Sequence, residues 1–183
     1  MNALAQCLHT DPLGIEEFIE WENQQETRHE LLEGEIIAMT GGTFAHARLI
    51  THLVTRLSNH LDKTSCTVLS SDFKVLTAEE VFYPDVLVTC TRQENEDLFC
   101  TAPKLIIEVL SNSTARKDRF KKRAAYQQIE SLEEYVLVSQ EARHVEIYRR
   151  ADDWQACIHI GGLVELRSVG LALDMDELYA SLD

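Results

Sequence analysis

Residues 105–110 read Leu-Ile-Ile-Glu-Val-Leu and are the most informative stretch of this chain. A run this apolar predicts a central strand that is buried on both faces of a sheet. Glu108 interrupts the run, and an ionised carboxylate in such a strand costs several kcal/mol unless it is paired or bound to a cation. Glu108 is therefore predicted to be held for function, to form a buried ion pair, or to reach water at a strand end.

A second apolar stretch with an embedded acid lies upstream. Val81-Phe-Tyr-Pro-Asp-Val-Leu-Val88 predicts part of a strand over 81–90, interrupted by Pro84 and Asp85. Proline lacks a ladder donor, so Pro84 indicates an edge, a strand start or a bulge, and bulges often re-aim a side chain at a site. A Pro-Asp pair alone is also common in turns. Combined with Glu108 on the following strand, Asp85 predicts a site for a hard cation.

A helix is predicted downstream, from a cap at Ser113 or Thr114 to about Ile129. At about 100° per residue, its small and apolar face includes Asp118 and Lys122. These two residues stand four positions apart, where they can form an ion pair. One interpretation is purely structural: the methylene chain of Lys122 is buried and its amine reaches water at the surface. The other places the Lys122 amine over the two carboxylates.

The remaining elements flank this centre and set the fold class. The patterns predict a helix over 15–25, a hairpin of 29–33 and 35–40 around Gly34, a helix from Thr43 to about Leu61, strands over 66–76, 81–90, 104–110 and 134–139, a hairpin of 144–150 and 154–160, and a last helix capped by Asp174. This order predicts an α/β (α+β) fold, a mixed β-sheet core flanked by helices. We expect one domain over 1–183, with a core at about 43–140 and additions at both ends.

Composition limits the class of protein. The chain has 183 residues, of which 45% are hydrophobic and 26% charged, as in ordinary soluble domains. No apolar run approaches the roughly 20 residues that span a bilayer, and no export signal is visible, so we expect a cytoplasmic protein without a membrane partner. The five cysteines are odd in number and contain no C-x-x-C pair. They indicate neither a zinc knuckle nor a disulfide framework.

The net charge of −14 opposes binding to nucleic acid. A nucleic-acid function therefore needs a local basic surface and a bridging cation. Six of the 17 basic residues lie between Arg116 and Arg123, although such a run is more often a solvated helix face. We predict that the phosphate-facing set, with side chains pointing away from the carboxylates, is Arg116, Lys117, Arg119 and Lys121.

Two further residues could support the site. His46 lies on the apolar side of the helix that starts at Thr43, one turn before Ile50, and is predicted to point inward. It is either a core histidine satisfied by a backbone carbonyl or a functional group. Glu30, in the hairpin around Gly34, could supply a further carboxylate.

Together these residues resemble the PD-(D/E)XK nuclease pattern, with Pro84-Asp85, a gap, and Glu108 on the next strand. More closely, the chain resembles the Uma-two family of restriction-endonuclease-like proteins over nearly its whole length. The resemblance lies in Glu30-Leu-Leu-Glu-Gly-Glu35, His46, Tyr83-Pro-Asp-Val-Leu-Val88, Pro103-Lys-Leu-Ile-Ile-Glu-Val-Leu-Ser111, Ser113-Thr114, Asp118, Lys122, Tyr126 and Glu134-Tyr135.

The chain departs from these patterns at several positions. In the superfamily pattern a lysine lies two residues after the glutamate, where this chain has Leu110. The Uma-two pattern resembles a version in which the lysine has moved to the following helix, which fits Lys122. Val136, Ser139 and His29 stand where that family usually has tryptophan, aspartate and tyrosine.

The resemblance implies hydrolysis of nucleic-acid phosphodiester bonds, with DNA as the expected partner and Mg²⁺ or Mn²⁺ as the cofactor. Asp85, Glu108 and the carbonyl of Val109 would hold the metal, which activates water and stabilises charge on the phosphate. Lys122 would orient the water or neutralise charge. The expected catalytic set, with its supporting residues last, is Asp85, Glu108, Lys122, Glu30 and His46.

Two alternatives from other classes stay open. The first is a non-catalytic binding or assembly module with a nuclease fold, which the net charge of −14 favours. The second is a metal hydrolase of a small phosphorylated substrate, which would not have to overcome the long-range repulsion of DNA. Family analogy alone suggests a homodimer.

Overall fold

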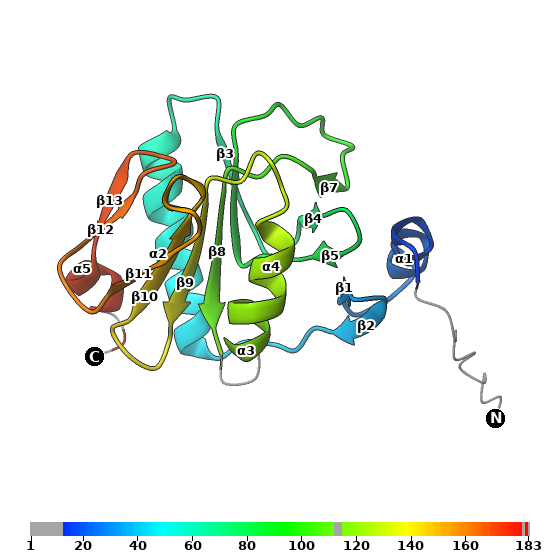
Figure 1. Ribbon diagram of the computed structural model, residues 1–183, viewed down its shortest axis with the longest axis horizontal. Helices are drawn as coiled ribbons and strands as arrows, with labels where there is room; N and C mark the ends of the chain where they lie inside the picture. The colour runs from blue at the N-terminus through cyan, green and yellow to red at the C-terminus, as the bar shows by residue number, and fades with distance from the viewer. Residues whose placement is uncertain (1–12, 112–114, 181, 183) are drawn as a thin grey trace.

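The computed structural model describes residues 13–111, 115–180 and 182 (Figure 1). Its elements are α1 (Ile15–Glu22), β1 (His29–Leu32), β2 (Glu35–Ala38), α2 (Phe44–Leu61), β3 (Thr67–Ser70), β4 (Lys74–Leu76), β5 (Val81–Phe82), β6 (Val86–Thr89), β7 (Phe99–Cys100), β8 (Leu105–Leu110), α3 (Ala115–Lys117), the π-helical segment η1 (Asp118–Lys122), α4 (Arg123–Tyr126), β9 (Glu134–Ser139), β10 (Val145–Arg149), the 3-10 segment η2 (Arg150–Asp152), β11 (Ala156–His159), β12 (Leu163–Leu166), β13 (Leu171–Asp174) and α5 (Met175–Tyr179).

The strands form one large mixed sheet, one smaller sheet and a separate hairpin. The large sheet has the order β11-β10-β9-β8-β6-β3, the smaller one β2-β1-β5-β4-β7, and β12 pairs with β13. Within the large sheet, β8 is parallel to β9 and antiparallel to β6. All six residues of β8 are buried, as the run Leu105–Leu110 predicts. The expected mixed sheet flanked by helices is confirmed.

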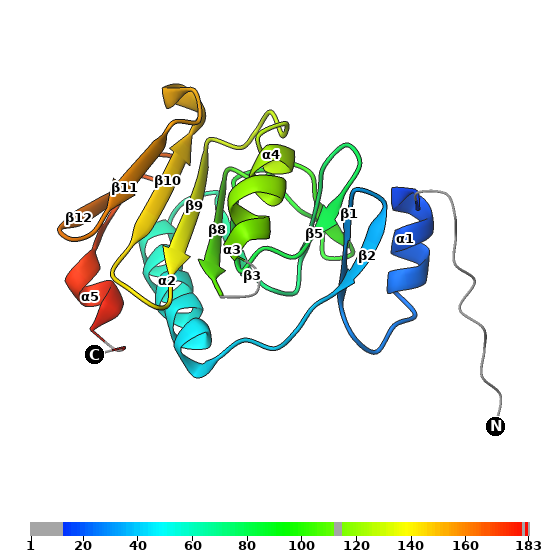
Figure 2. The same cartoon turned by 60° about the horizontal axis from the view of Figure 1, so that its bottom comes forward.

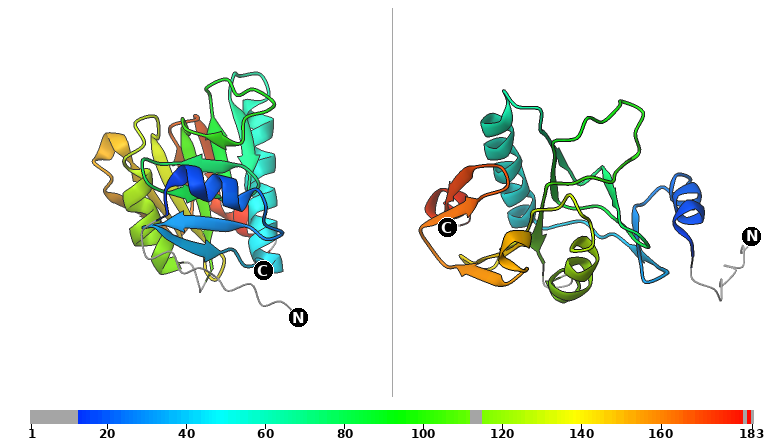
Figure 3. Two further views of the ribbon diagram at one scale, coloured as in Figure 1. Left: turned by 90° about the vertical axis from the view of Figure 1, so that its right-hand side faces the viewer. Right: turned by 45° about the horizontal axis from the view of Figure 1, so that its top comes forward.

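Helices cover both faces of the large sheet (Figure 3, right). On one face α2 packs through Leu49, Leu53 and Leu57 against a cluster that includes Ile107. On the other face the segment α3–η1–α4 packs through Tyr126 and its neighbours against a second cluster. Alternate residues of β8 therefore point toward different helices, and Glu108 points toward the second one. The hairpin β1–β2 with α1 lies at one end of the molecule and α5 at the other (Figure 2).

Two strands that the sequence predicts as single elements are each broken in two. Residues 66–76 form β3 and β4, with a break at Ser71, which has a φ of 42°. Residues 81–90 form β5 and β6, with Pro84 and Asp85 between them. The backbone N–H of Ser71 donates to the carbonyl of Pro84 at 3.2 Å, so the two breaks lie side by side. The chain passes from the larger sheet to the smaller one at the first break and returns to the larger sheet at the second, and Asp85 lies at this crossing.

The helix boundaries follow the expected caps. The Thr43 side chain accepts from the N–H of His46 at 3.1 Å, and the Asp174 side chain accepts from Asp176 at 2.7 Å. The cap expected at Ser113 or Thr114 lies outside the described residues. The helix that follows contains the π-helical segment η1, a type of distortion that is frequent at functional sites. No helix in the described part of the chain is long and apolar enough to cross a membrane.

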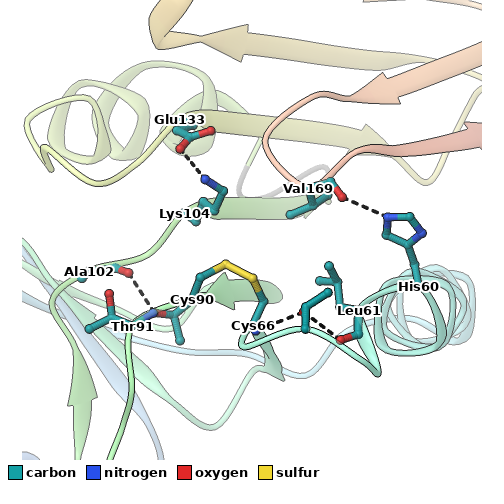
Figure 4. Close-up of a disulfide and its surroundings, with 11 residues drawn as sticks. His60, Leu61, Cys66, Cys90, Thr91, Ala102, Lys104, Glu133 and Val169 are labelled. Carbon is teal, nitrogen blue, oxygen red and sulfur yellow. Dashed lines mark hydrogen bonds and ion pairs between the residues drawn. A yellow bond between two sulfur atoms is a disulfide. The ribbon is translucent and has the colours of Figure 1, made fainter.

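Cys66 and Cys90 form a disulfide (Figure 4). The scattered cysteines did not indicate disulfide bonding, and on this point the sequence-based expectation is wrong. The pairing follows from the register of two antiparallel strands. Thr67 of β3 lies opposite Thr89 of β6, and the next residues outward, Cys66 and Cys90, therefore face each other. Their separation of 24 residues forms no recognisable motif. Among the described residues, Cys100 and Cys157 are free thiols.

Removing this disulfide is expected to lower the free energy of unfolding by about 3 kcal/mol, because the bond closes a loop of intermediate length in the unfolded chain. Urea unfolding of a Cys66→Ser/Cys90→Ser variant measures the loss. The matched control, Cys157→Ser, should stay within about 0.5 kcal/mol of the parent protein. If a reducing agent leaves the parent protein's stability unchanged, the bond does not form in solution.

Candidate active site

The predicted site residues come from five separate segments of the chain. Glu108 lies in β8, Asp85 immediately before β6, Lys122 at the end of η1, Glu30 in β1 and His46 in the first turn of α2. The structure brings all five together at the crossing between the two sheets. Figure 2 shows the α3–α4 segment between β8 on one side and β5 and β1 on the other.

Asp85 and Glu108 lie next to each other and are locked by the backbone. The N–H of Asp85 donates to Glu108 Oε2 at 3.3 Å, and the N–H of Val109 donates to Asp85 Oδ2 at 2.7 Å. Glu108 is 3% exposed, whereas the Asp85 side chain is 17% exposed. The pair therefore consists of a buried acid, Glu108, and a partly exposed acid, Asp85, that reaches solvent.

Lys122 lies on the opposite side of Glu108. Its Nζ is 3.1 Å from Glu108 Oε1, 2.7 Å from Glu30 Oε1 and 3.7 Å from Asp118 Oδ1. The side chain is 6% exposed, so it does not extend to the surface. The ion pair with Asp118 exists, but it is the longest of the three contacts. Lys122 is therefore placed over the carboxylates.

Glu30 binds two lysines rather than one. Besides Lys122, it accepts from Lys117 Nζ at 2.6 Å, and its other oxygen accepts from the N–H of Tyr83 at 3.3 Å. The prediction that the basic run points away from the site is thus wrong for Lys117. The physical reason is that β1, which is distant in sequence, places the buried carboxylate of Glu30 within contact of both Lys117 and Lys122.

The other predicted phosphate-facing residues differ from one another. Arg119 lies 2.8 Å from Glu146, and Lys121 lies 2.5 Å from Glu33. Arg116 is exposed and has no carboxylate partner among the residues that the structure describes. The protein's excess of acids therefore neutralises most of the basic run. Of the four predicted residues, Arg116 keeps its charge available to a phosphate.

His46 interacts with Asp85. Its Nε2 lies 3.2 Å from Asp85 Oδ2, and its side chain is 16% exposed. The pKa of His46 is raised by this hydrogen bond, against the effect of burial and with help from the Asp85 charge and the backbone of Val109. Gly42 makes room for the ring, because a Cβ at that position would lie 2.6 Å from His46 Nδ1. The carboxylate contact makes His46 part of the site, not simply a core histidine.

Two tyrosines reach the site although the sequence assigns them no role. Tyr126 donates its hydroxyl to Glu108 Oε1 at 3.3 Å, and Tyr135 donates to the backbone carbonyl of Asp118 at 3.1 Å. Both are fully buried. The one available signal was the position of Tyr126 on the buried helix face together with Lys122, since a buried hydroxyl needs a partner.

Burial and neighbouring charges determine the state of Glu108. Its pKa is raised well above the usual range, first by burial and then by the charges of Asp85, Asp118 and Glu30, while Lys122 opposes the shift. Without a cation, Glu108 therefore tends to hold a proton at a pH where an ordinary carboxyl is ionised.

Glu30 and Lys122 form the stable ionised pair. Burial alone would raise the pKa of Glu30, but the charges of Lys122 and Lys117 outweigh burial and lower it. The pKa of Lys122 is raised, because Glu108 and Glu30 outweigh the opposing effect of burial. Lys122 therefore keeps its proton and carries a full positive charge.

The donor set fits a hard divalent cation. The carboxylates of Asp85 and Glu108 and the carbonyl of Val109 are oxygen donors, which Mg²⁺ and Mn²⁺ prefer. Within 13–111, 115–180 and 182, no three acidic, histidine or cysteine side chains form a ready-made metal cluster. Two carboxylates suffice for Mg²⁺, which usually keeps several waters. The charges of Asp85, Asp118 and Glu30, which add to the effect of burial in raising the pKa of Glu108, would also favour a cation at this carboxylate.

Comparison with known proteins gives relatives of similar length. Residues 15–176 match the Uma2 family, described as "Putative restriction endonuclease". The uncharacterized proteins slr1290 and sll1609 of Synechocystis sp. are 36% and 34% identical, over 93% and 80% of this chain and 93% and 85% of their own lengths. A crystal structure described as a "putative nuclease belonging to DUF820" from Anabaena variabilis superposes with a TM-score of 0.81, at 20% identity, over 94% of this chain and 100% of that one.

The solved structure establishes the nuclease-like fold, and the family match extends over most of the chain. The chain belongs to the Uma2 family.

Proposed function

We propose that this protein is a metal-dependent nuclease. Asp85, Glu108 and Lys122 would form the active site at which phosphodiester bonds are hydrolysed. The description of its family, "Putative restriction endonuclease", supports a nucleic-acid substrate. The observation that carries the proposal is the position of Glu108, a buried acid with Asp85 on one side and the Lys122 amine 3.1 Å away on the other. Burying these charged groups costs folding free energy, so the arrangement is expected where the groups serve a function.

Asp85, Glu108 and the Val109 carbonyl are the proposed metal-holding groups. Nucleases with this kind of fold generally use divalent cations, and a bound Mg²⁺ or Mn²⁺ supplies an activated water and stabilises charge on the phosphate. The N–H of Val109 and the ring of His46 both contact Asp85 Oδ2, at 2.7 and 3.2 Å. These contacts orient the Asp85 carboxylate, so His46 is proposed as a positioning residue.

The raised pKa of Lys122 excludes the role of a general base. Because it stays protonated between Glu30 and Glu108, its ammonium group cannot accept a proton from water. It can instead neutralise the negative charge that develops on the phosphate in the transition state. Glu30 is proposed as the positioning residue that holds this ammonium group, since their atoms lie 2.7 Å apart.

A cleavage assay tests the proposal. In a panel of single-stranded and duplex DNA and RNA, at least one substrate should be cut in Mg²⁺ or Mn²⁺ but not in EDTA, and Asp85→Asn should reduce the rate at least about 100-fold, as expected for loss of one electrostatic group at a transition state. Asp72→Asn, which changes a surface acid bound to Arg28, is the matched control and should cut normally. Hydrolysis of a small phosphodiester alone would instead indicate a small-substrate hydrolase. Nucleic-acid binding without any hydrolysis would indicate a binding module.

A further inference from the structure

Phe120 is an exposed aromatic residue on the helix that carries Lys122. It is 61% exposed, while its neighbours Asp118 and Lys122 in η1 are buried. A single exposed apolar side chain is common on protein surfaces and does not by itself mark a site. The surroundings of this ring are what point to a ligand.

Phe120 lines an open hollow of about 480 Å³ together with three cations, Arg116, Lys117 and Lys121. Lys117 and Lys121 are paired with Glu30 and Glu33, whereas Arg116 has no carboxylate partner in the described part of the chain. The hollow therefore offers an aromatic ring beside one available positive charge, on a protein with a net charge of −14. This combination suits one base and one phosphate better than the paired backbones of a duplex.

The hollow adjoins the candidate active site through one side chain. Lys117 lines the hollow, and its Nζ lies 2.6 Å from Glu30 Oε2. The other oxygen of Glu30 lies 2.7 Å from Lys122, which contacts Glu108. A nucleotide held against Phe120 would therefore be connected to Glu108 through three ion-pair contacts, Lys117–Glu30, Glu30–Lys122 and Lys122–Glu108.

We propose that Phe120 stacks on an unpaired nucleobase, so that the substrate is single-stranded or locally unpaired nucleic acid; this rests on the proposed nuclease function. In a duplex, each base is covered by its neighbours and offers no face to a surface ring. An unpaired base does offer its face, and stacking is tolerant of sequence. Salt does not screen stacking as it screens phosphate contacts, so stacking gives an acidic protein affinity that its net charge opposes.

Fluorescence anisotropy with hydrolysis-resistant phosphorothioate oligonucleotides tests this inference. Phe120→Ala should weaken binding of single-stranded DNA or RNA by about 5- to 150-fold, the range for loss of one stacked base, and leave duplex binding unchanged. Phe120→Trp should retain the affinity. Arg116→Gln should reduce the log–log salt slope for a single strand by about 0.7, whereas Phe120→Ala should leave that slope unchanged.

Phe44→Ala is the matched control. Phe44 is 77% exposed and has Arg48 over its ring at 5.5 Å, but it lines a different hollow, on α2. Its removal should leave single-strand affinity unchanged. The inference is overturned if Phe120→Ala binds single strands normally, or if it loses affinity for single strands and duplex equally. It is also overturned if Phe120→Ala changes the oligomeric state in light scattering, or if the parent protein binds no single strand at all. Cleavage by the parent protein with normal binding by Phe120→Ala would refute stacking alone. Phe120-dependent binding without cleavage would refute the nuclease function alone.

Discussion

Replacing Lys122 with methionine is expected to lower the free energy of unfolding by about 3 to 5 kcal/mol, the loss typical of removing one partner from a buried ion pair. The ammonium group lies within 3.1 Å of both Glu30 and Glu108, and the two acids are 2% and 3% exposed. Without Lys122, a charge on Glu108 would face Asp85 with no opposing cation. Urea unfolding at neutral pH measures the loss.

Lys121→Met provides the control for this change. Lys121 is the neighbouring residue and is also ion-paired, but its contact with Glu33 is at the surface, with side chains 49% and 61% exposed. Exposed pairs contribute between about 0 and 1 kcal/mol, so this variant should be nearly as stable as the parent protein. Equal losses in the two variants would contradict the idea that Lys122 holds the site together.

Replacing Glu108 with glutamine is expected to stabilise the metal-free protein by about 1 to 2 kcal/mol and to abolish its stabilisation by Mn²⁺. Glutamine keeps the shape of the protonated acid but carries no charge to desolvate. The parent protein should gain about 2.7 kcal/mol when Mn²⁺ is present at about 100 times its Kd. Glu108→Gln should gain nothing from the metal. Thermal melts with and without Mn²⁺ measure both effects.

The pH dependence of stability has a definite sign. The pKa of Glu108 in the folded protein lies above the value of 4.5 for an unperturbed carboxyl, so the folded state binds more protons than the unfolded state. Stability from this group is therefore full below about pH 4.5 and is lost as the pH rises toward the raised pKa. Glu108→Gln should remove this decline, while Glu79→Gln, which changes an exposed acid, should not. A large loss of stability in Glu108→Gln at unchanged Mn²⁺ affinity would indicate a structural ion pair.

The candidate site was predictable because its residues break local patterns. Glu108 is charged within an apolar strand, and Lys122 lies on the helix face that also carries Tyr126. A charge in a buried position needs a partner, so such residues are expected to meet. The structure places Lys122 within 3.1 Å of Glu108, although they come from different elements. Catalysis itself stays a prediction.

The features that the sequence did not predict depend on long-range pairing. Apolar residues continue through 66–76 and 81–90, so the change of sheet is marked only by Pro84 and Asp85. The disulfide of Cys66 with Cys90 depends on the register of β3 with β6. Likewise, the pairing of Lys117 depends on where the hairpin β1–β2 packs. None of these contacts has a local sequence signal, because each joins segments that only the tertiary fold brings together.

A crystal soaked in MnCl₂ tests the central claim, that Asp85 and Glu108 hold a divalent cation, independently of any substrate. We expect an anomalous difference peak at coordinating distance from one oxygen each of Asp85 and Glu108 and from the Val109 carbonyl, and no such peak in crystals of Glu108→Gln. A peak elsewhere, for instance among the surface acids Glu16, Glu17 and Glu79, with the Asp85–Glu108 pair bound only to Lys122, would contradict the claim.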